Sequence, residues 1–162
     1  MQFKKQNNKV AIIMGSQSDH SIMKDCEKIL KILKVKYQVS IVSAHRTPKR
    51  MFDFAEKAEK NGFGVIIAGA GGAAHLAGMV ASLTILPVLG VPMETKKLKG
   101  LDSLLSMVQM PKGVPIGCLA IDGAFNAGIL AASIIGNYDE KIKSNLEKWR
   151  RLQTQSIKKK PK

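Results

Sequence analysis

Short, continuous runs of apolar residues recur along the chain, and each is followed by a stretch of mixed polarity. Runs of this length that are rich in Val, Ile and Leu are typical of strands buried on both faces of a sheet. The first run leads directly into a polar turn that contains glycine and serine. The pattern predicts five strands, at residues 10–14, 37–42, 64–68, 86–90 and 115–121.

The stretches between these runs place apolar residues three and four positions apart, which predicts amphipathic helices. In the first of them, Ile22, Cys26 and Ile29 share one side, and lysines occupy the other. Strands that alternate with helices favour a parallel sheet covered on both faces, with right-handed crossovers. Helices are predicted over residues 22–33, from 48 to 61, from 75 to 83, near 101–107, over 126–135 and from 139 to about 153.

The chain of 162 residues has the size of one ordinary domain, and its pattern shows neither a linker nor an internal repeat. Aromatic residues make up only 5% of it, while 14 residues are glycine. A core of small aliphatic side chains fits a layered α/β domain better than a β-sandwich. We therefore predict a single α/β domain over residues 1–162, with a core at about 9–153 and basic tails at 1–8 and 154–162.

The net charge of +14 suggests a nucleic-acid partner at first sight, but its distribution argues otherwise. Residues 1–9 and 148–162 hold ten Lys or Arg and no acid, which leaves +4 on residues 10–147, from 16 basic and 12 acidic side chains. Basic ends make salt-sensitive contacts with polyanions but are more often solvated. Without interleaved aromatic residues or a recognisable motif, we expect no specific nucleic-acid partner.

Composition also bears on location and metal binding. No apolar run is long enough to span a bilayer, and residues 1–9 have no apolar signal core, so we expect a cytoplasmic protein with no membrane partner. Cys26 and Cys118 lack the close spacing of a metal or redox pair, and we expect both to be reduced core residues. No His, Cys, Asp and Glu spacing typical of a metal site is present, so no metal is expected.

Three turns, at residues 15–19, 43–47 and 69–75, follow the first three predicted strands. Because ligands of parallel sheets bind beyond the carboxyl ends of the strands, we expect these turns to form one pocket. The second turn carries His45 beside Arg46, and a helix is predicted to follow, with Thr47 as its candidate N-cap and Pro48 at its first position. A titratable imidazole beside a fixed cation at a helix N-terminus suits a small anionic ligand that exchanges a proton. The alternative is an exposed turn with incidental polar residues.

The first turn offers backbone amides at Gly15, hydroxyls at Ser16 and Ser18, and the carboxylate of Asp19. Amides and hydroxyls can hold a phosphate, and a carboxylate can accept hydrogen bonds from ribose hydroxyls. In the alternative interpretation, Ser18 or Asp19 merely caps the following helix. The turn has neither the P-loop nor the dinucleotide-binding spacing, so neither ATP nor NAD is expected.

The third turn is rich in glycine and alanine and includes Gly71 and Gly72. A loop without large side chains lets a flat ring approach the backbone closely. The turn ends in His75, which is a candidate second proton carrier or hydrogen-bond donor; the alternative is a histidine packed at a helix start. His20 has no comparable neighbours, and we expect it to be a surface residue.

Three segments together resemble the N5-carboxyaminoimidazole ribonucleotide mutase family: Met-Gly-Ser-Gln-Ser-Asp at 14–19, Ser-Ala-His-Arg-Thr-Pro at 43–48, and Gly-Ala-Gly-Gly-Ala-Ala-His-Leu at 69–76. The resemblance extends over about residues 9–153. It implies a three-layer αβα domain with a flavodoxin-like open parallel sheet, assembled as a homo-octamer. It also implies a reaction of purine synthesis, in which carboxylate moves from the exocyclic nitrogen to a ring carbon of aminoimidazole ribonucleotide without metal, ATP or organic cofactor.

The resemblance also assigns roles to residues. It implies that His45 is the general acid and base and that Ser16, Asp19 and Arg46 contact the nucleotide, while Ser43, the loop at 69–72 and His75 line the ring and the carboxylate. The expected site comprises His45 and His75 as catalytic residues, and Gly15, Ser16, Ser18, Asp19, Ser43, Ala44, Arg46, Gly71 and Gly72 as substrate-binding residues.

Two alternatives to the mutase reaction remain open at this stage. Relatives that carboxylate aminoimidazole ribonucleotide directly with carbon dioxide typically carry lysine in the motif where this chain has Arg46, so the arginine favours the mutase. The other alternative is a nucleotide-binding module without catalysis.

One departure from the family pattern is Ala77, where proline is common. Alanine is compatible with a helix, and we expect the turn to be kept.

Overall fold

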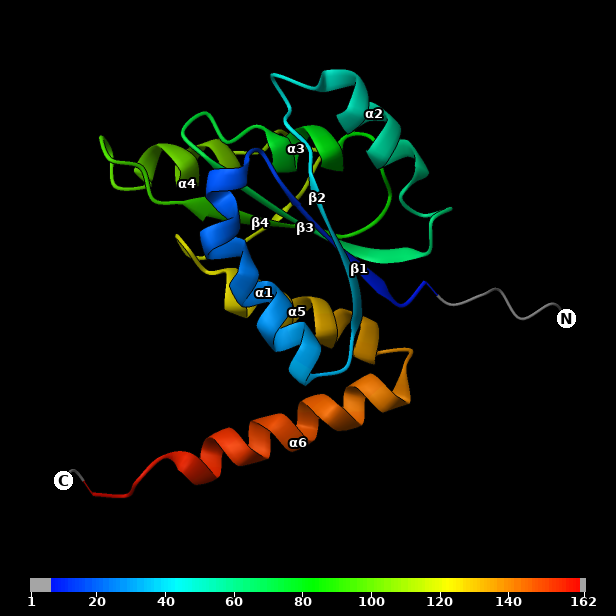
Figure 1. Cartoon of the computed structure of the whole chain (residues 1–162), viewed down its shortest axis with the longest axis vertical. Coiled ribbons are helices and arrows are strands. Elements are labelled where there is room, and N and C mark those ends of the chain that lie inside the picture. Colours follow the sequence, from blue (N-terminus) through cyan, green and yellow to red (C-terminus); the bar gives the residue numbers. More distant parts are fainter. Residues whose placement is uncertain (1–6, 161–162) are drawn as a thin grey trace, which may run out of the picture.

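The computed structural model describes residues 7–160 (Figure 1). Five parallel strands form one sheet in the order β2-β1-β3-β4-β5. This architecture confirms the predicted flavodoxin-like open sheet with helices on both faces. The strands are β1 (Lys9–Met14), β2 (Lys36–Ile41), β3 (Phe63–Gly71), β4 (Val88–Met93) and β5 (Gly117–Cys118).

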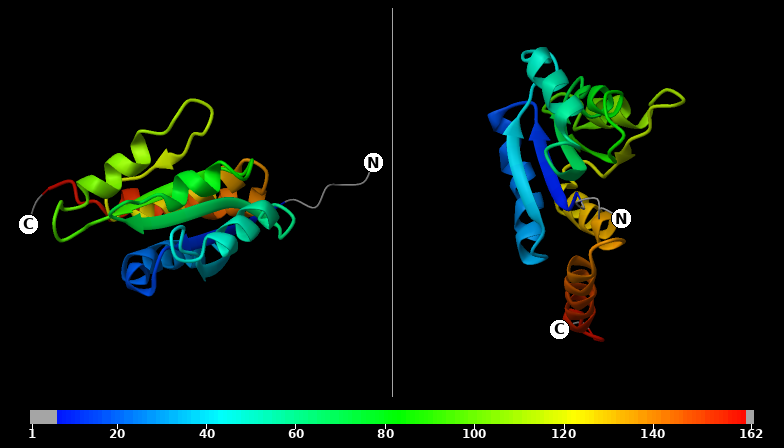
Figure 2. Two further views of the ribbon diagram at one scale, coloured as in Figure 1. Left: turned by 90° about the horizontal axis from the view of Figure 1, so that it is seen from above. Right: turned by 90° about the vertical axis from the view of Figure 1, so that its right-hand side faces the viewer.

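Helices cover both faces of the sheet (Figures 1 and 2). One face packs against α1 (His20–Ile32) and α5 (Ala124–Gly136), with α6 (Glu140–Ser156) lying outside α5. The other face packs against α2 (Pro48–Lys57), α3 (Leu76–Ala81) and α4 (Leu101–Val108). A short 3₁₀ helix, η1 (Gln17–Asp19), connects β1 to α1.

The central strands explain why their sequence is apolar without alternation. In β1, Val10, Ile12 and Met14 pack on the side of α1 and α5, while Ala11 and Ile13 pack on the side of α2 and α3. All five side chains are buried, because a parallel strand with helices on both faces has no solvated side. The same double burial continues in β3 and holds the carboxyl ends of the strands in a fixed arrangement.

Helices α1 and α5 approach each other closely at Gly128. A methyl group there would collide with the Ile29 side chain and lie 3.3 Å from the Cys26 carbonyl oxygen. The Cys26 thiol donates to the Ala124 carbonyl at 2.9 Å, and burial raises its pKa to about 12. Cys26 is therefore the buried free thiol that we predicted, whereas Cys118 is only partly buried and does not meet that prediction.

Several element boundaries differ from the predicted ones. β3 and β4 extend to Gly71 and Met93 because the two strands stay paired through that register. β5 shrinks to two residues: it lies at the sheet edge and pairs with β4 alone. α2 ends at Lys57, before a turn that closes at Gly62, and α6 continues to Ser156, beyond the predicted end.

Candidate active site

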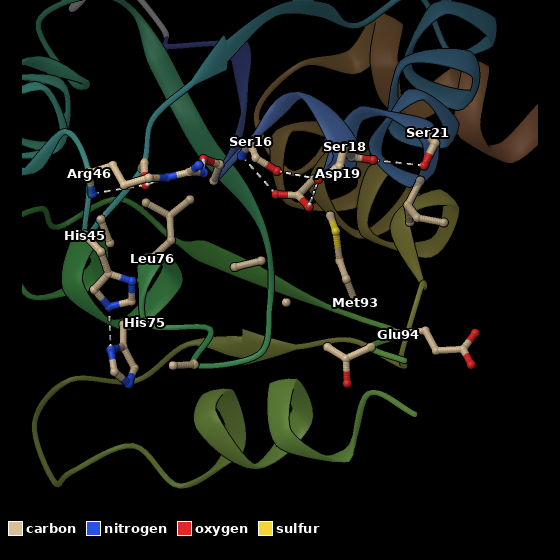
Figure 3. A pocket seen from close by; sticks show the side chains of 18 of the residues that line it. Ser16, Ser18, Asp19, Ser21, His45, Arg46, His75, Leu76, Met93 and Glu94 are labelled. Atoms are coloured by element: carbon tan, nitrogen blue, oxygen red, sulfur yellow. Dashed lines mark hydrogen bonds between the residues drawn. The ribbon is translucent and has the colours of Figure 1, made fainter. Parts of the chain in front are cut away.

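A pocket of about 670 Å³ lies at the carboxyl ends of the strands (Figure 3). The turns after β1, β2 and β3 meet there, as the position of three polar or glycine-rich turns in the sequence predicted. Of the predicted site residues, those that line the pocket are Gly15, Ser16, Ser18, Asp19, Ser43, Ala44, His45, Arg46, Gly71 and His75. Gly72 is not among the lining residues: its N–H donates to Ser103 Oγ at 2.9 Å, and its carbonyl lies 3.3 Å from Ser106 Oγ.

The turn between β2 and α2 is held by its own side chains. Thr47 Oγ1 donates to the Ser43 carbonyl and accepts from the Ser43 N–H, both at 3.0 Å. Thr47 is the N-cap residue and Pro48 begins the helix, as predicted, but the threonine hydroxyl closes the turn and makes no bond to the helix amides. Together, Thr47 and Pro48 fix the boundary between the turn and α2.

Arg46 joins the second turn to the first. Its backbone N–H and its Nε donate to Ser43 Oγ at 3.2 and 3.3 Å, and its Nη2 donates to the Gly15 carbonyl at 2.9 Å. The guanidinium is thereby fixed at the pocket wall although the side chain is exposed. A fixed, permanently charged group of this kind can bind a phosphate or carboxylate with little loss of side-chain entropy.

The first turn forms a compact polar network. Asp19 Oδ2 accepts from the Ser16 N–H at 3.0 Å, and the Ser16 and Ser18 hydroxyls lie 2.6 Å apart. The Asp19 carboxylate therefore accepts a backbone hydrogen bond at the start of η1 and also lines the pocket. Functional and capping interpretations of Asp19 are geometrically compatible, since one carboxylate oxygen takes the amide and the group still has acceptor capacity.

The two predicted histidines form a pair. His45 Nε2 and His75 Nδ1 are 2.9 Å apart, with ring centroids 5.0 Å apart and planes at 79°. Figure 3 shows the two rings meeting edge to face, with His45 coming from the turn after β2 and His75 from the start of α3. One nitrogen donates to the other, so the pair holds a proton between the rings and leaves a further ring nitrogen on each for a ligand. The arrangement suits proton transfer.

Two acidic residues that the sequence did not single out complete the pocket. Glu94 follows β4 and lies across the pocket from His45 (Figure 3), while Asp122 follows β5 and accepts from the Glu94 N–H at 3.0 Å. Asp122 has a left-handed backbone, with φ of 56°. Both residues come directly after strands, so the rule that selected the first three turns applies to them as well. Glu94 was missed because the predicted fourth strand ended too early, at residue 90. Asp122 was missed because the prediction was confined to the turns after the first three strands.

The remaining observations concern groups outside the pocket. His20 Nε2 lies 2.7 Å from Glu27 Oε1 and does not line the pocket, in agreement with its predicted surface position. Within residues 7–160, no cluster of three or more His, Cys, Asp or Glu side chains could hold a metal ion. No helix in that part of the chain has the length and hydrophobicity required to cross a membrane.

The profile of the AIR carboxylase family matches residues 9–156. The chain belongs to the AIR carboxylase family. Its relatives include the N5-carboxyaminoimidazole ribonucleotide mutases of Escherichia coli K12, 54% identical over 92% of this chain and 89% of the relative, and of Thermotoga maritima, 58% identical over 88% and 86%. Among solved structures, the crystal structure of Treponema denticola PurE matches with a TM-score of 0.84 and 26% identity, over 92% of this chain and 93% of that one.

Proposed function

We propose that the protein converts N5-carboxyaminoimidazole ribonucleotide into its ring-carboxylated isomer, a step of purine nucleotide synthesis. The mutase names of relatives that are 54 to 58% identical support this reaction. The observation in this chain that carries the proposal is the pair of imidazoles 2.9 Å apart at the pocket. A carboxylate transfer within one molecule needs a proton donor that later becomes a proton acceptor, and an imidazole performs both roles near neutral pH.

In the proposed mechanism, the bond between the exocyclic nitrogen and the carboxylate carbon breaks and releases carbon dioxide. His45 gives a proton to that nitrogen. The ring carbon then attacks the carbon dioxide, and the proton on that carbon returns to His45 as the new carbon–carbon bond forms. One proton leaves the enzyme and one comes back, so the isomerisation consumes no net proton. His75 holds the His45 ring in place for both transfers through their shared hydrogen bond.

We assign the ribonucleotide to the first two turns. Ser16, Ser18 and the Gly15 backbone bind the phosphate together with Arg46, and Asp19 accepts hydrogen bonds from the ribose. Ser43, Ala44 and Gly71 contact the imidazole ring and the carboxylate. We assign Gly72 the shaping of its loop and not a contact with the substrate, because its N–H donates to Ser103 of α4.

The proposed assembly is a homo-octamer in the cytoplasm. Exposed apolar side chains support association: Leu101, Leu105 and Val108 form a stripe on α4, with exposed fractions of 52, 51 and 45%. Association also answers a need of the chemistry. His45 and His75 are exposed in the single chain, so bound substrate and neighbouring copies must exclude water while carbon dioxide is held. Sedimentation should give the mass of eight chains, and a monomer at working concentration contradicts the assembly.

The reaction is tested by supplying each substrate separately. With N5-carboxyaminoimidazole ribonucleotide and no bicarbonate, the purified protein should form the carbon-carboxylated product. With aminoimidazole ribonucleotide and bicarbonate, the rate should be no greater than without enzyme. The reverse result overturns the proposal in favour of direct carboxylation.

The role of His45 is tested by His45→Asn, which should lower kcat by roughly 10²- to 10⁴-fold because the proton donor is lost. His20→Asn is the matched control, because His20 lies outside the pocket, and it should leave kcat unchanged. A His45→Asn variant that binds and turns over like the wild type indicates a different catalytic group.

A further inference from the structure

Ser103 of α4 occupies an unusual position for a polar side chain. It is completely buried, and Ser43 is the other buried polar residue in the part of the chain that the structure describes. Its hydroxyl donates to the Met93 carbonyl at 2.7 Å and accepts from the Gly72 N–H at 2.9 Å. One oxygen atom therefore joins three segments: the end of β4, the glycine-rich loop after β3, and α4.

Helix α4 holds the Gly72 peptide mainly through Ser103, which accepts the Gly72 N–H at 2.9 Å. The Ser106 hydroxyl lies 3.3 Å from the Gly72 carbonyl, but its one hydrogen is donated mainly to the closer Asp102 carbonyl, at 2.7 Å. Gly72 has a left-handed backbone, with φ of 70°, so the loop changes direction at the residue that α4 grips. Only two residues, Ala73 and Ala74, separate Gly72 from His75, and the His75 N–H donates to the Ala73 carbonyl at 2.8 Å. Little chain remains between Gly72 and His75 to absorb a displacement.

We propose that Ser103 is a positioning residue, which fixes the Gly72 peptide and thereby keeps the His75 imidazole within hydrogen-bonding distance of His45. The proposal rests on the proposed function, because it assigns Ser103 to the proton-transfer pair. A hydroxyl suits the position because the Met93 carbonyl requires a donor and the Gly72 N–H requires an acceptor. Alanine leaves both groups without a partner inside the protein, while threonine retains the hydroxyl.

The proposal predicts which kinetic constant changes. The residues assigned to the phosphate and the ribose lie on the turns after β1 and β2, and none of them bonds to Ser103. In the Ser103→Ala variant, kcat should therefore fall at least tenfold while KM changes less than threefold. Ser103→Thr should restore at least a third of the wild-type kcat. Ser133→Ala is the matched control, because the Ser133 hydroxyl bonds only to Ile129 of its own helix, and it should leave both constants unchanged.

A second set of variants separates positioning from a general loss of structure. If Ser103 acts through His75, replacing it should add less than a twofold loss of kcat when His75 is already alanine. Losses that multiply in the double variant overturn the proposal, as does a folded Ser103→Ala enzyme with kcat within twofold of the wild type. If Ser103→Ala does not fold, the proposal is decided by Ser103→Cys, which has similar shape and weaker hydrogen bonds: kcat should fall at least threefold with KM preserved, and an unchanged kcat overturns it.

One measurement is independent of the reaction. Proton-detected NMR of the imidazole nitrogens should show the hydrogen bond between His45 and His75 in the wild type and its loss in Ser103→Ala, with the control Ser133→Ala unchanged. Retention of that signal in Ser103→Ala refutes the positioning role. A wild-type protein that shows the signal but does not convert the substrate refutes the proposed function and leaves the positioning role supported.

Discussion

The two buried serines hold neighbouring turns of the pocket by different means. Ser43 closes its turn with residues three and four positions away, through Arg46 and Thr47. Ser103 holds the loop after β3 from a helix 31 residues further along the chain. The turn after β2 is held by hydrogen bonds among its own residues. The loop after β3 acquires its shape only when α4 packs against it. Two halves of one pocket thus depend on different levels of structure.

Among changes within the two turns themselves, the largest effect on stability should come from Ser43→Ala. The Arg46 N–H and Nε lose their acceptor in a partly buried turn, and such a loss costs about 1–3 kcal/mol. We expect the free energy of unfolding to fall by about 2 kcal/mol, measured by urea unfolding at fixed protein concentration.

Ser82→Ala is the control for this change, because the exposed Ser82 hydroxyl bonds only to the Met79 carbonyl within its own turn. It should cost less than about 0.5 kcal/mol. Equal effects of the two substitutions show that the turn after β2 does not depend on its serine.

An intermediate effect is expected from Gly72→Ala, which tests the loop that α4 holds. A side chain at Gly72 meets no atom within 4 Å, so the cost is the left-handed backbone itself, about 1 kcal/mol. Gly72→Asn should cost less, because asparagine tolerates this conformation better than alanine. Urea unfolding of both variants checks the order, and an alanine variant as stable as the wild type shows that the loop can change its backbone conformation freely.

The smallest effect is the coupling between the two serines. Their hydrogen bonds share no partner, so the losses of unfolding free energy in Ser43→Ala and Ser103→Ala should add to within about 0.5 kcal/mol in the double variant. A coupling above about 1 kcal/mol contradicts the separation of the two turns and indicates that the contact between His45 and His75 joins them into one network.

The sequence predicts the parts of the molecule that local patterns control. The apolar runs of β1 and β3 are continuous because both faces of these strands are buried, and Thr47 with Pro48 marks the start of α2. The meeting of three turns follows from the rule that parallel strands point the same way. These features required no knowledge of which distant segments pack together.

The remaining features depend on long-range packing. Nothing near Gly72 in the sequence indicates that Ser103 accepts its N–H, because the contact forms only after α4 docks on the sheet. His45 and His75 are 30 residues apart in the sequence, and their direct contact likewise depends on how the turn after β2 and the loop after β3 are placed next to each other in the fold. The extension of β4 to Met93 is set by pairing with β3, and with it the position of Glu94 in the pocket.

The close approach of α5 to α1 has a mechanical consequence for the pocket. Because Gly128 has no side chain, α5 can approach α1 closely at this position. Helix α1 begins at His20, directly after Asp19 in the pocket wall. A larger side chain at position 128 would push α1 away from α5 and would displace the Asp19 carboxylate together with α1. The width of the pocket at Asp19 therefore depends partly on a glycine that does not line the pocket.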